Sequence, residues 1–352
     1  MSRRVHSGSY VSSRRLAVAL ALAALTGSLS ACGGSESASS GGKDEPITIA
    51  VAAGATAFST IYVAQERGYF KDEGVDVKLI DNAGANAVPM LASGQADLAF
   101  SGVAAALALG QQKPTKVVLS MLGGFSAAAL VGGPDIHSIK DLKGKKIGTP
   151  GTGTTSDAYA HIYDKRLHLG VDIVPFTTPV ALVAAVKSGQ VDAGVGTASL
   201  YADVIASGDA HVVLQAGDPE MADVLGTVKY PEGALFGLAD VVDKKADDVV
   251  KVIAAIESAS AEMKSQDPSV TAATISKTSL YHNTPVDVLT RNLAYDVNFI
   301  LPNGGNITES DWKVALDQFK DGGVLKGATI PDSVSFANLI DMTAFEKAQE
   351  PK

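Results

Sequence analysis

A run of glycine and hydroxyl residues carries the clearest chemistry in this 352-residue chain. Residues 150–156 read Pro-Gly-Thr-Gly-Thr-Thr-Ser and follow a short predicted strand that ends at Thr149. A helix is predicted from about Ser156 to Leu167, so the loop lies on the N-terminus of a helix. Backbone N–H groups and hydroxyls at such a terminus bind an anionic or strongly polar group, and the helix dipole assists them. A plain capped turn is the alternative role for the same residues.

Further hydroxyl, glycine and aromatic residues follow predicted strand ends elsewhere in the chain. Ligands gather at the carboxyl ends of parallel strands in α/β units, where helix N-termini point. We therefore predict a ligand-binding site built from Phe58, Ser59, Thr60, Ser101, Gly102, Phe125, Gly153, Thr154, Thr155, Thr197 and Ser199. Turn or cap chemistry is the alternative for the hydroxyl residues, and packing beneath a loop is the alternative for the aromatic ones.

No residue pattern predicts catalysis or a cofactor. The six histidines do not form a cluster with metal-ligand spacing, no serine lies in a Gly-x-Ser-x-Gly elbow, and no paired-carboxylate motif occurs. The loop at residues 150–156 lacks the Gly-Lys-Ser/Thr ending of a P-loop and the acidic ribose contact of a Rossmann site. We expect no catalytic residue, no metal site and no cofactor.

The single cysteine, Cys32, indicates a different chemistry. Four arginines and no acidic residue precede an apolar run over residues 16–25, and residues 29–32 read Leu-Ser-Ala-Cys. A basic start, a short apolar core and small residues before a cut are typical of a secretory signal. The tetrapeptide resembles a bacterial lipobox, which implies that the Cys32 thiol is lipidated and becomes the new N-terminus. We expect a lipoprotein signal peptide at residues 1–31 and a flexible Ser/Gly-rich tether at residues 32–45; an ordinary secretory signal is the alternative.

The elements that position the predicted site begin with a β-α-β-α-β unit. Large apolar residues alternate with small or polar ones over residues 47–52 and 75–79, and a third, buried strand is predicted at residues 96–100. Gly68 and Gly94 stand where the two intervening helices need a left-handed C-cap. Strands joined in this way are parallel, with right-handed crossovers. Their carboxyl ends place Ser101 and Gly102 on one wall of a predicted cleft.

An internal repeat predicts a second, similar half. Ser93-Gly94-Gln95 and Asp97 recur as Ser188-Gly189-Gln190 and Asp192, 95 residues later. Each copy reads as a helix, a glycine cap and a strand, so these glycines and aspartates are expected to be structural. The strand ends that follow, near Ser101 and near Thr197, should occupy matching places on opposing walls of a cleft that closes by a hinge.

Composition limits the classes of partner. The formal net charge is −9, and removal of the four arginines in the leader makes it more negative, so binding of nucleic acid is not expected. With 46% hydrophobic residues the chain can bury a large core, and its length fits two lobes. No second apolar run approaches the length of a membrane span.

Several phrases of the sequence resemble one protein family. AQERGYFKDEGVDVKLI followed by LASGQADLAFSG, and later SIKDLKGKKIG, resemble the extracytoplasmic solute-binding proteins of bacterial ABC importers. The nearest group is the binders of aliphatic sulfonates, taurine, nitrate and thiamine precursors, described as NMT1/THI5-like. The resemblance implies an α/β, two-lobe, periplasmic-binding-protein-like fold of type II. In that fold each lobe has a mostly parallel sheet with flanking helices, and the cleft lies between the lobes.

The same resemblance implies a division of the chain and a set of partners. Lobe 1 would comprise residues 46–132, lobe 2 residues 133–226, and residues 227–352 would return to lobe 1 and add C-terminal helices. The expected partners are a small-molecule solute, an ABC permease with its ATPase, and the cell membrane through the lipid on Cys32, for a monomer held outside the cytoplasm. No arginine lies in a candidate loop, which departs from the pattern expected for a tightly held free sulfonate or nitrate; backbone donors that suffice for such an anion and a less charged ligand are the two alternatives.

Two other functions share this fold class. Pyrimidine synthases and some menaquinone-pathway lyases are enzymes of similar architecture, but the export signal and the lack of a cofactor motif disfavour them. A regulatory effector domain of the LysR type would need a helix-turn-helix, which the sequence does not predict. We therefore expect a solute-binding protein and not an enzyme.

Overall fold

The structure, a computed structural model, describes residues 45–52, 56–82, 87–216, 218–226, 231–300, 304–327 and 329–351. The predicted signal peptide, most of the tether and Cys32 lie outside the described residues. Within the described residues, no helix is both long enough and apolar enough to cross a membrane.

The first of two sheets contains five strands in the order β2-β1-β3-β10-β4. Its strands are β1 (Ile47–Ala52), β2 (Val77–Asn82), β3 (Leu98–Gly102), β4 (Thr115–Gly123) and β10 (Pro231–Leu238). Strand β1 pairs in parallel with β2 and β3, while β10 runs antiparallel to both β3 and β4. The β-α-β-α-β prediction for this part of the chain is confirmed.

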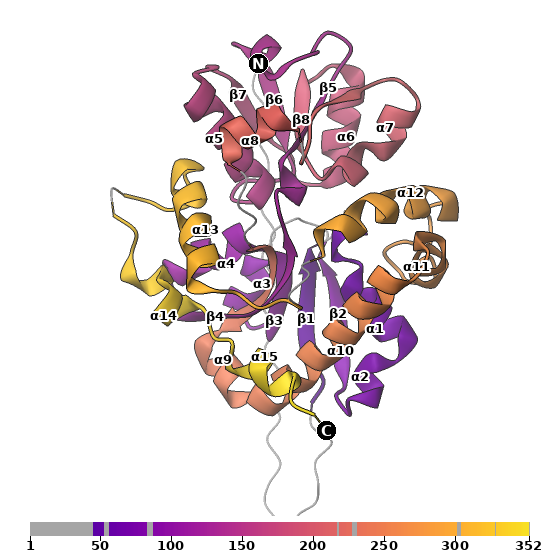
Figure 1. Ribbon diagram of the computed structural model, residues 1–352, viewed down its shortest axis with the longest axis vertical. Helices are drawn as coiled ribbons and strands as arrows, with labels where there is room; N and C mark the ends of the chain where they lie inside the picture. The colour runs from indigo at the N-terminus through magenta and orange to yellow at the C-terminus, as the bar shows by residue number, and fades with distance from the viewer. Residues whose placement is uncertain are drawn as a thin grey trace, which may run out of the picture. The chain divides into compact units, whose positions relative to one another are not determined.

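The second sheet has the same design, in the order β7-β6-β8-β5-β9. Its strands are β5 (Ala129–Gly132), β6 (Lys146–Thr149), β7 (Asp172–Pro175), β8 (Ala193–Gly196) and β9 (His211–Leu214). Strand β6 pairs in parallel with β7 and β8, and β5 runs antiparallel to β8 and β9. We call the first sheet with the helices packed on it lobe 1, and the second sheet with its helices lobe 2 (Figure 1).

The α-helices have the following bounds: α1 Thr60–Arg67, α2 Tyr69–Asp72, α3 Val88–Ala92, α4 Val103–Gly110, α5 Thr155–Leu167, α6 Pro179–Ser188, α7 Ala202–Ala206, α8 Pro219–Leu225, α9 Ala239–Lys244, α10 Ala246–Ser265, α11 Pro268–Ile275, α12 Val286–Asp296, α13 Glu309–Asp321, α14 Phe336–Leu339 and α15 Thr343–Ala348. The longest, α10, packs its apolar face on α1, α2 and α15. Short 3-10 helices include η1 (Thr56–Phe58), η2 (Ser126–Ala128), η4 (Ala198–Tyr201) and η5 (Val297–Phe299).

The internal repeat has a common structural role in the two lobes. Asp97 accepts hydrogen bonds from the backbone N–H and the hydroxyl of Thr48 in β1, at 2.8 and 2.7 Å. Asp192 likewise accepts a hydrogen bond from the backbone N–H of Lys146 in β6, at 2.8 Å. Each aspartate therefore ties the chain entering one strand to the first residues of the neighbouring strand. Gly94 and Gly189 both adopt positive φ angles, as the predicted caps require.

Two features of the fold differ in detail from the prediction. Strand β2 begins at Val77 rather than Val75, and β3 begins at Leu98 rather than Ala96, because the turns before them use those residues. The expected start of lobe 2, at residue 133, follows β5, and β5 is paired within the second sheet. Counted by sheets, the chain passes from lobe 1 to lobe 2 between β4 and β5.

Candidate functional site

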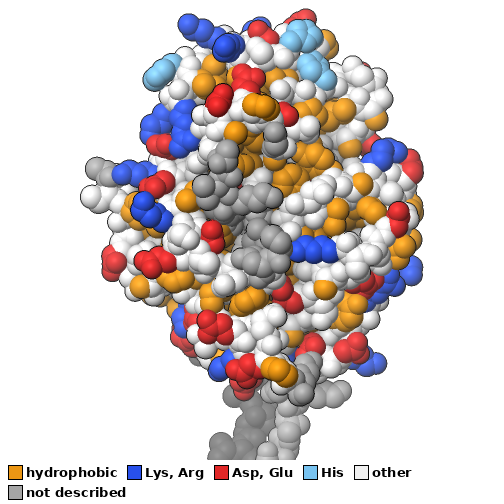
Figure 2. Space-filling view, viewed as in Figure 1, with side chains coloured by type: hydrophobic (Ala, Val, Ile, Leu, Met, Phe, Trp, Pro, Cys, Tyr) orange, Lys and Arg blue, Asp and Glu red, His pale blue; other side chains and the backbone are white. Residues whose placement is uncertain are grey.

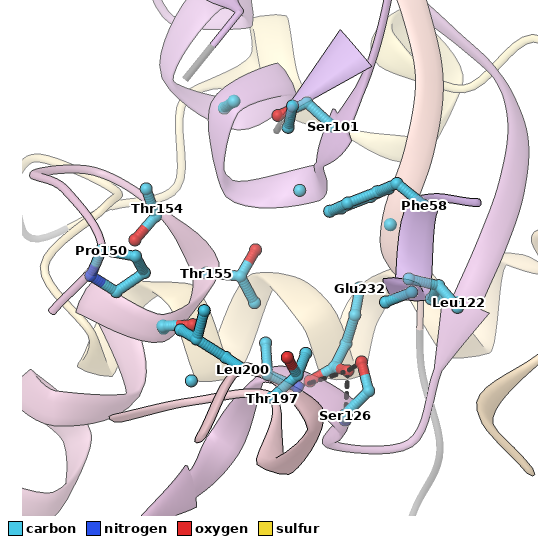
Figure 3. A pocket seen from close by; sticks show the side chains of 18 of the residues that line it. Phe58, Ser101, Leu122, Ser126, Pro150, Thr154, Thr155, Thr197, Leu200 and Glu232 are labelled. Carbon is cyan, nitrogen blue, oxygen red and sulfur yellow. Dashed lines mark hydrogen bonds between the residues drawn. The ribbon is translucent and has the colours of Figure 1, made fainter. Parts of the chain in front are cut away.

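A cavity lies between the lobes, where strands of both sheets end. Its volume is about 80 Å³, and Figure 3 shows its lining from close by. On the face seen in Figure 2, hydrophobic side chains gather in the hollow between the two lobes. Seven predicted site residues line the cavity: Phe58, Ser101, Gly102, Gly153, Thr154, Thr155 and Thr197. The structure thus brings together residues that are almost 140 positions apart in the sequence.

The wall from lobe 1 is formed by η1 and the junction of β3 with α4. Phe58 is fixed by an edge-to-face contact with Phe100 of β3, with ring centroids 5.6 Å apart. Gly102 is the last residue of β3 and the N-cap of α4. A methyl group built on Gly102 would lie only 2.5 Å from the Thr155 Oγ1 atom of lobe 2. Glycine is needed here because the two walls approach each other closely.

The glycine and threonine loop of lobe 2 uses much of its own hydrogen-bonding capacity. Thr154 caps α5 by accepting a hydrogen bond from the backbone N–H of Asp157, and it donates one to the carbonyl of Gly151 at 2.9 Å. The buried Asp157 carboxylate accepts bonds from the Gly153 N–H at 2.9 Å and from the Thr149 hydroxyl at 2.8 Å. The Gly153 N–H and the Thr154 hydroxyl, expected to be available to an anionic ligand, are therefore engaged within the loop. These two groups therefore have the structural role of a capped turn, which is the alternative given for this loop in the sequence analysis.

Thr155 behaves differently from its neighbour. Its side chain lines the cavity and is 5% exposed, and its Oγ1 atom has no hydrogen-bond partner among the described residues. A buried hydroxyl without a partner costs free energy, so a polar atom brought into the cavity would be stabilised there. In Figure 3 the Thr155 hydroxyl lies between the loop of lobe 2 and Ser101 of lobe 1.

Glu232, at the start of β10, lines the cavity and is 2% exposed. Its Oε2 atom accepts hydrogen bonds from the backbone N–H and the hydroxyl of Ser126, at 2.5 and 2.6 Å, and its Oε1 atom accepts one from the Tyr159 hydroxyl. Burial raises the pKa of Glu232, and these donors oppose the rise. Ser126 lies just before β5 and Tyr159 lies in α5, so Glu232 connects β10 of lobe 1 with the connection between the lobes and with a helix of lobe 2.

Asp296, the last residue of α12, joins the lobes at a second place. Its buried carboxyl group accepts hydrogen bonds from the hydroxyl of Thr56 in lobe 1 and from the hydroxyl of Ser199 in lobe 2, the latter at 3.0 Å. Burial raises the pKa of Asp296 to about 7, against the lowering effect of these two donors. The charge state of this carboxyl group therefore changes near neutral pH.

Four predicted site residues do not line the cavity. Ser59 and Thr60 are buried at the start of α1, where they pack inside lobe 1. Phe125 lies beside η2 with a left-handed backbone, and its ring meets the Tyr159 ring edge-on at 6.3 Å. The Ser199 hydroxyl donates a hydrogen bond to Asp296 and lies 3.0 Å from the Thr197 hydroxyl, from which it can accept one. Packing describes Ser59, Thr60 and Phe125; Ser59 is the N-cap residue of α1 but makes no side-chain cap hydrogen bond.

The sequence prediction missed Glu232, Ser126 and Asp296. A signal for Glu232 exists, because it is the one charged residue in the otherwise apolar run Pro231–Leu238. Asp296 has a weaker signal, a carboxylate on the buried face of an amphipathic helix. Among the residues that the structure describes, no group of three histidine, cysteine, aspartate or glutamate side chains could hold a metal ion.

A comparison with protein families gives one match. The NMT1/THI5-like family model matches residues 55–269, which is more than half of the chain and includes most of both sheets. No curated protein sequence matches this chain.

Solved structures with the same fold match most of the chain. A protein from Bordetella bronchiseptica RB50 has a TM-score of 0.72 and 21% identity, over 86% of this chain and 96% of its own. The ligand-binding component of an ABC-type import system from Staphylococcus aureus, with zinc bound, has a TM-score of 0.67 and 13% identity, over 87% and 100%. The alkanesulfonate-binding protein from Xanthomonas axonopodis pv. citri, bound to MOPS, has a TM-score of 0.65 and 17% identity, over 84% and 97%. At these identities the similarity establishes the two-lobe, periplasmic-binding-protein-like fold.

Proposed function

Since the chain belongs to the NMT1/THI5-like family, we propose that it is the extracytoplasmic solute-binding component of an ABC importer. It captures one small organic molecule in the cavity between its lobes and delivers the molecule to a permease that an ATPase drives. The observation that carries this proposal is the position of the cavity, which is lined by strand ends of both sheets. A ligand there contacts both lobes at once, so binding favours the arrangement in which the lobes are closed.

The ligand contacts that we propose come from both walls. Phe58, Ser101 and Gly102 would meet the ligand from lobe 1, and Thr155 and Thr197 would meet it from lobe 2. The mostly apolar lining excludes water, and hydrogen bonds to the hydroxyl groups are stronger in such a setting than in water. Thr155 is the central contact of this set. Its hydroxyl has no hydrogen-bond partner among the described residues, so it loses no hydrogen bond to them when a ligand binds.

We further propose that the protein is held at the outer face of the cell membrane by a lipid on Cys32. The basic leader, the short apolar run and the Leu-Ser-Ala-Cys tetrapeptide of residues 29–32 support this. The Ser/Gly-rich tether at residues 32–45 would let the folded lobes reach the permease. The other lobe boundaries given above, at residues 46 and 227, stay part of this proposal, as does a monomeric state.

Native mass spectrometry of freshly purified protein tests the proposed function. We expect a mass increase from one retained small molecule, which is lost under denaturing conditions because no covalent bond holds it. The released molecule should be recovered chemically unchanged after prolonged incubation with the protein. Turnover of that molecule would favour an enzyme of this fold, and failure of any small solute to bind would refute solute capture.

A further inference from the structure

The charge of the cavity differs from what a free anion requires. Among the described lining residues, Glu232 is the only charged side chain, and no lysine, arginine or histidine faces it there. The donors to Glu232 from described residues are neutral: the Ser126 hydroxyl and N–H groups, the Ala127 N–H and the Tyr159 hydroxyl. Buried charges in proteins are normally paired with an opposite charge, because desolvation is costly. The carboxylate of Glu232 lacks such a counter-charge among the described residues.

Hydrogen-bond accounting shows that Glu232 retains an open acceptor site. An ionised carboxylate has about four lone-pair sites. The Oε2 atom accepts from Ser126 twice and from Ala127 at 3.4 Å, so its capacity is used. The Oε1 atom accepts one bond from a described residue, that from Tyr159, which leaves capacity for a second donor. Because Glu232 lines the cavity, a ligand can supply that donor.

The second polar feature of the cavity is the Thr155 hydroxyl, which is buried and without a described partner. A hydroxyl both donates and accepts, so it places no charge requirement on the ligand. The remaining lining consists mostly of alanine, glycine, proline and leucine residues, together with serine and threonine residues. The volume, about 80 Å³, is smaller than the roughly 150 Å³ of a cavity that holds benzene. The ligand must therefore be compact and must leave little charge uncompensated.

From these features we infer that the cavity selects a compact ligand with a protonated amine or similar nitrogen cation that pairs with Glu232, and that it rejects free sulfonates, carboxylates and nitrate. This inference rests on the proposed function and specifies the ligand class of the same site. A cation beside Glu232 supplies the missing counter-charge and fills the open acceptor site on Oε1. An anion in the same place would face the buried carboxylate at short range, in a medium that screens the repulsion poorly.

A set of shape-matched probes tests the inference. Isobutylamine, isobutanol and isobutyrate share one apolar skeleton and carry a positive charge, no charge and a negative charge at neutral pH. We expect isothermal titration with the purified protein, dialysed to remove retained solute, to show binding of the ammonium at least about tenfold tighter than that of the alcohol, and no binding of the carboxylate. Tighter binding of isobutyrate, or of ethanesulfonate, than of isobutylamine would overturn the inference.

Two variants test whether the preference for the ammonium probe over the alcohol comes from Glu232. Glu232→Gln should bring the ammonium and the alcohol to within about twofold of each other, because the pair of opposite charges is lost. Glu262→Gln is the matched control: it removes the same charge from α10, where Glu262 pairs with Arg67 at 2.7 Å, and it should leave the preference unchanged. An unchanged preference in Glu232→Gln would also overturn the inference. Should that variant fail to fold, the ranking of the three probes on the wild-type protein decides alone.

The outcome also separates this inference from the proposed function. If native mass spectrometry finds a retained anion whose binding is lost in Thr155→Ala, solute capture in the cavity holds and the charge assignment is wrong. If the retained molecule carries a nitrogen cation and is lost in Glu232→Gln, both hold. If no small molecule of any charge binds, both fail.

Discussion

A methyl group at Gly102 should act as a wedge between the lobes. The backbone of Gly102 has φ −62° and ψ 140°, which alanine adopts without strain, so the effect of Gly102→Ala comes from the added atom alone. That atom would lie 2.5 Å from the Thr155 Oγ1 atom, 3.5 Å from the Thr155 Cβ atom and 3.8 Å from the Glu232 carbonyl oxygen. The first distance is roughly 1 Å shorter than normal van der Waals contact, and the other two are ordinary.

The expected magnitude follows from the cost of overpacking. An extra methylene forced into a well-packed site costs about 1–3 kcal/mol, and here the cost falls on the closed arrangement, in which the walls meet. Because each 1.4 kcal/mol is a tenfold change in a binding constant, the affinity for the retained solute should fall by roughly 5- to 150-fold. The solute released for native mass spectrometry serves as the titrant in isothermal calorimetry.

A double-mutant cycle separates the wedge from other effects. Thr155→Ala removes the hydroxyl that the methyl group strikes and leaves a Cβ atom at an ordinary distance of 3.5 Å. In that background Gly102→Ala should cost little, so the coupling energy should account for most of the effect of the single variant. Gly133→Ala is the matched control, because the nearest atom to its added methyl group is the Asp192 carbonyl oxygen at 3.4 Å. Strictly additive effects, or an equal loss in Gly133→Ala, would refute the account of closure.

Three other perturbations have defined outcomes. Thr154→Ala plus Thr155→Ala should weaken solute capture while the protein stays folded, at a cost near 1 kcal/mol for the lost helix cap; unchanged affinity in calorimetry would remove this loop from the site. For Asp296, whose pKa is raised by burial from 3.8 to about 7, the stabilising contribution is present below about pH 4 and is lost as the pH rises through 7. Between about pH 4 and pH 7, the free energy of unfolding of the wild type, measured in denaturant, should therefore fall relative to that of Asp296→Asn. Parallel curves of unfolding free energy against pH for the two proteins would contradict the raised pKa of Asp296. Cys32→Ser should release the protein from membranes into the soluble fraction, and retention of the variant would rule out the lipid anchor.

Much of the fold could be predicted from local patterns in the sequence. Alternating apolar residues and glycine caps mark β1, α1 and β3, and Gly68 ends α1 with a φ of 81° as its position predicts. The repeated Asp97 and Asp192 mark equivalent strands in the two lobes, because each carboxylate binds a neighbouring strand through a contact that depends on register. The alternation and the caps depend on residues close together in the sequence, whereas the Asp97 and Asp192 contacts span 49 and 46 residues and are indicated by the repeat alone.

The parts of the site that the sequence did not predict depend on long-range contacts. The hydrogen bonds from Thr56 and Ser199 to Asp296 span 240 and 97 residues, and that from Ser126 to Glu232 spans 106. Local patterns indicate at most that Glu232 and Asp296 are buried, and they do not show that either carboxylate connects the two lobes. The same limit explains why Thr155 could not be told apart from Thr154: whether a hydroxyl caps its own helix or faces the opposite lobe depends on where that lobe lies.

The central claim is that both lobes contact one solute in the space between them. A crystal structure of the protein with its retained solute tests this most directly. The account predicts density for a single small molecule enclosed between the end of β3 and the start of α5, within hydrogen-bond distance of Thr155 and touching residues of both sheets. Density on the outer surface of one lobe, or contacts with residues of only one sheet, would contradict it.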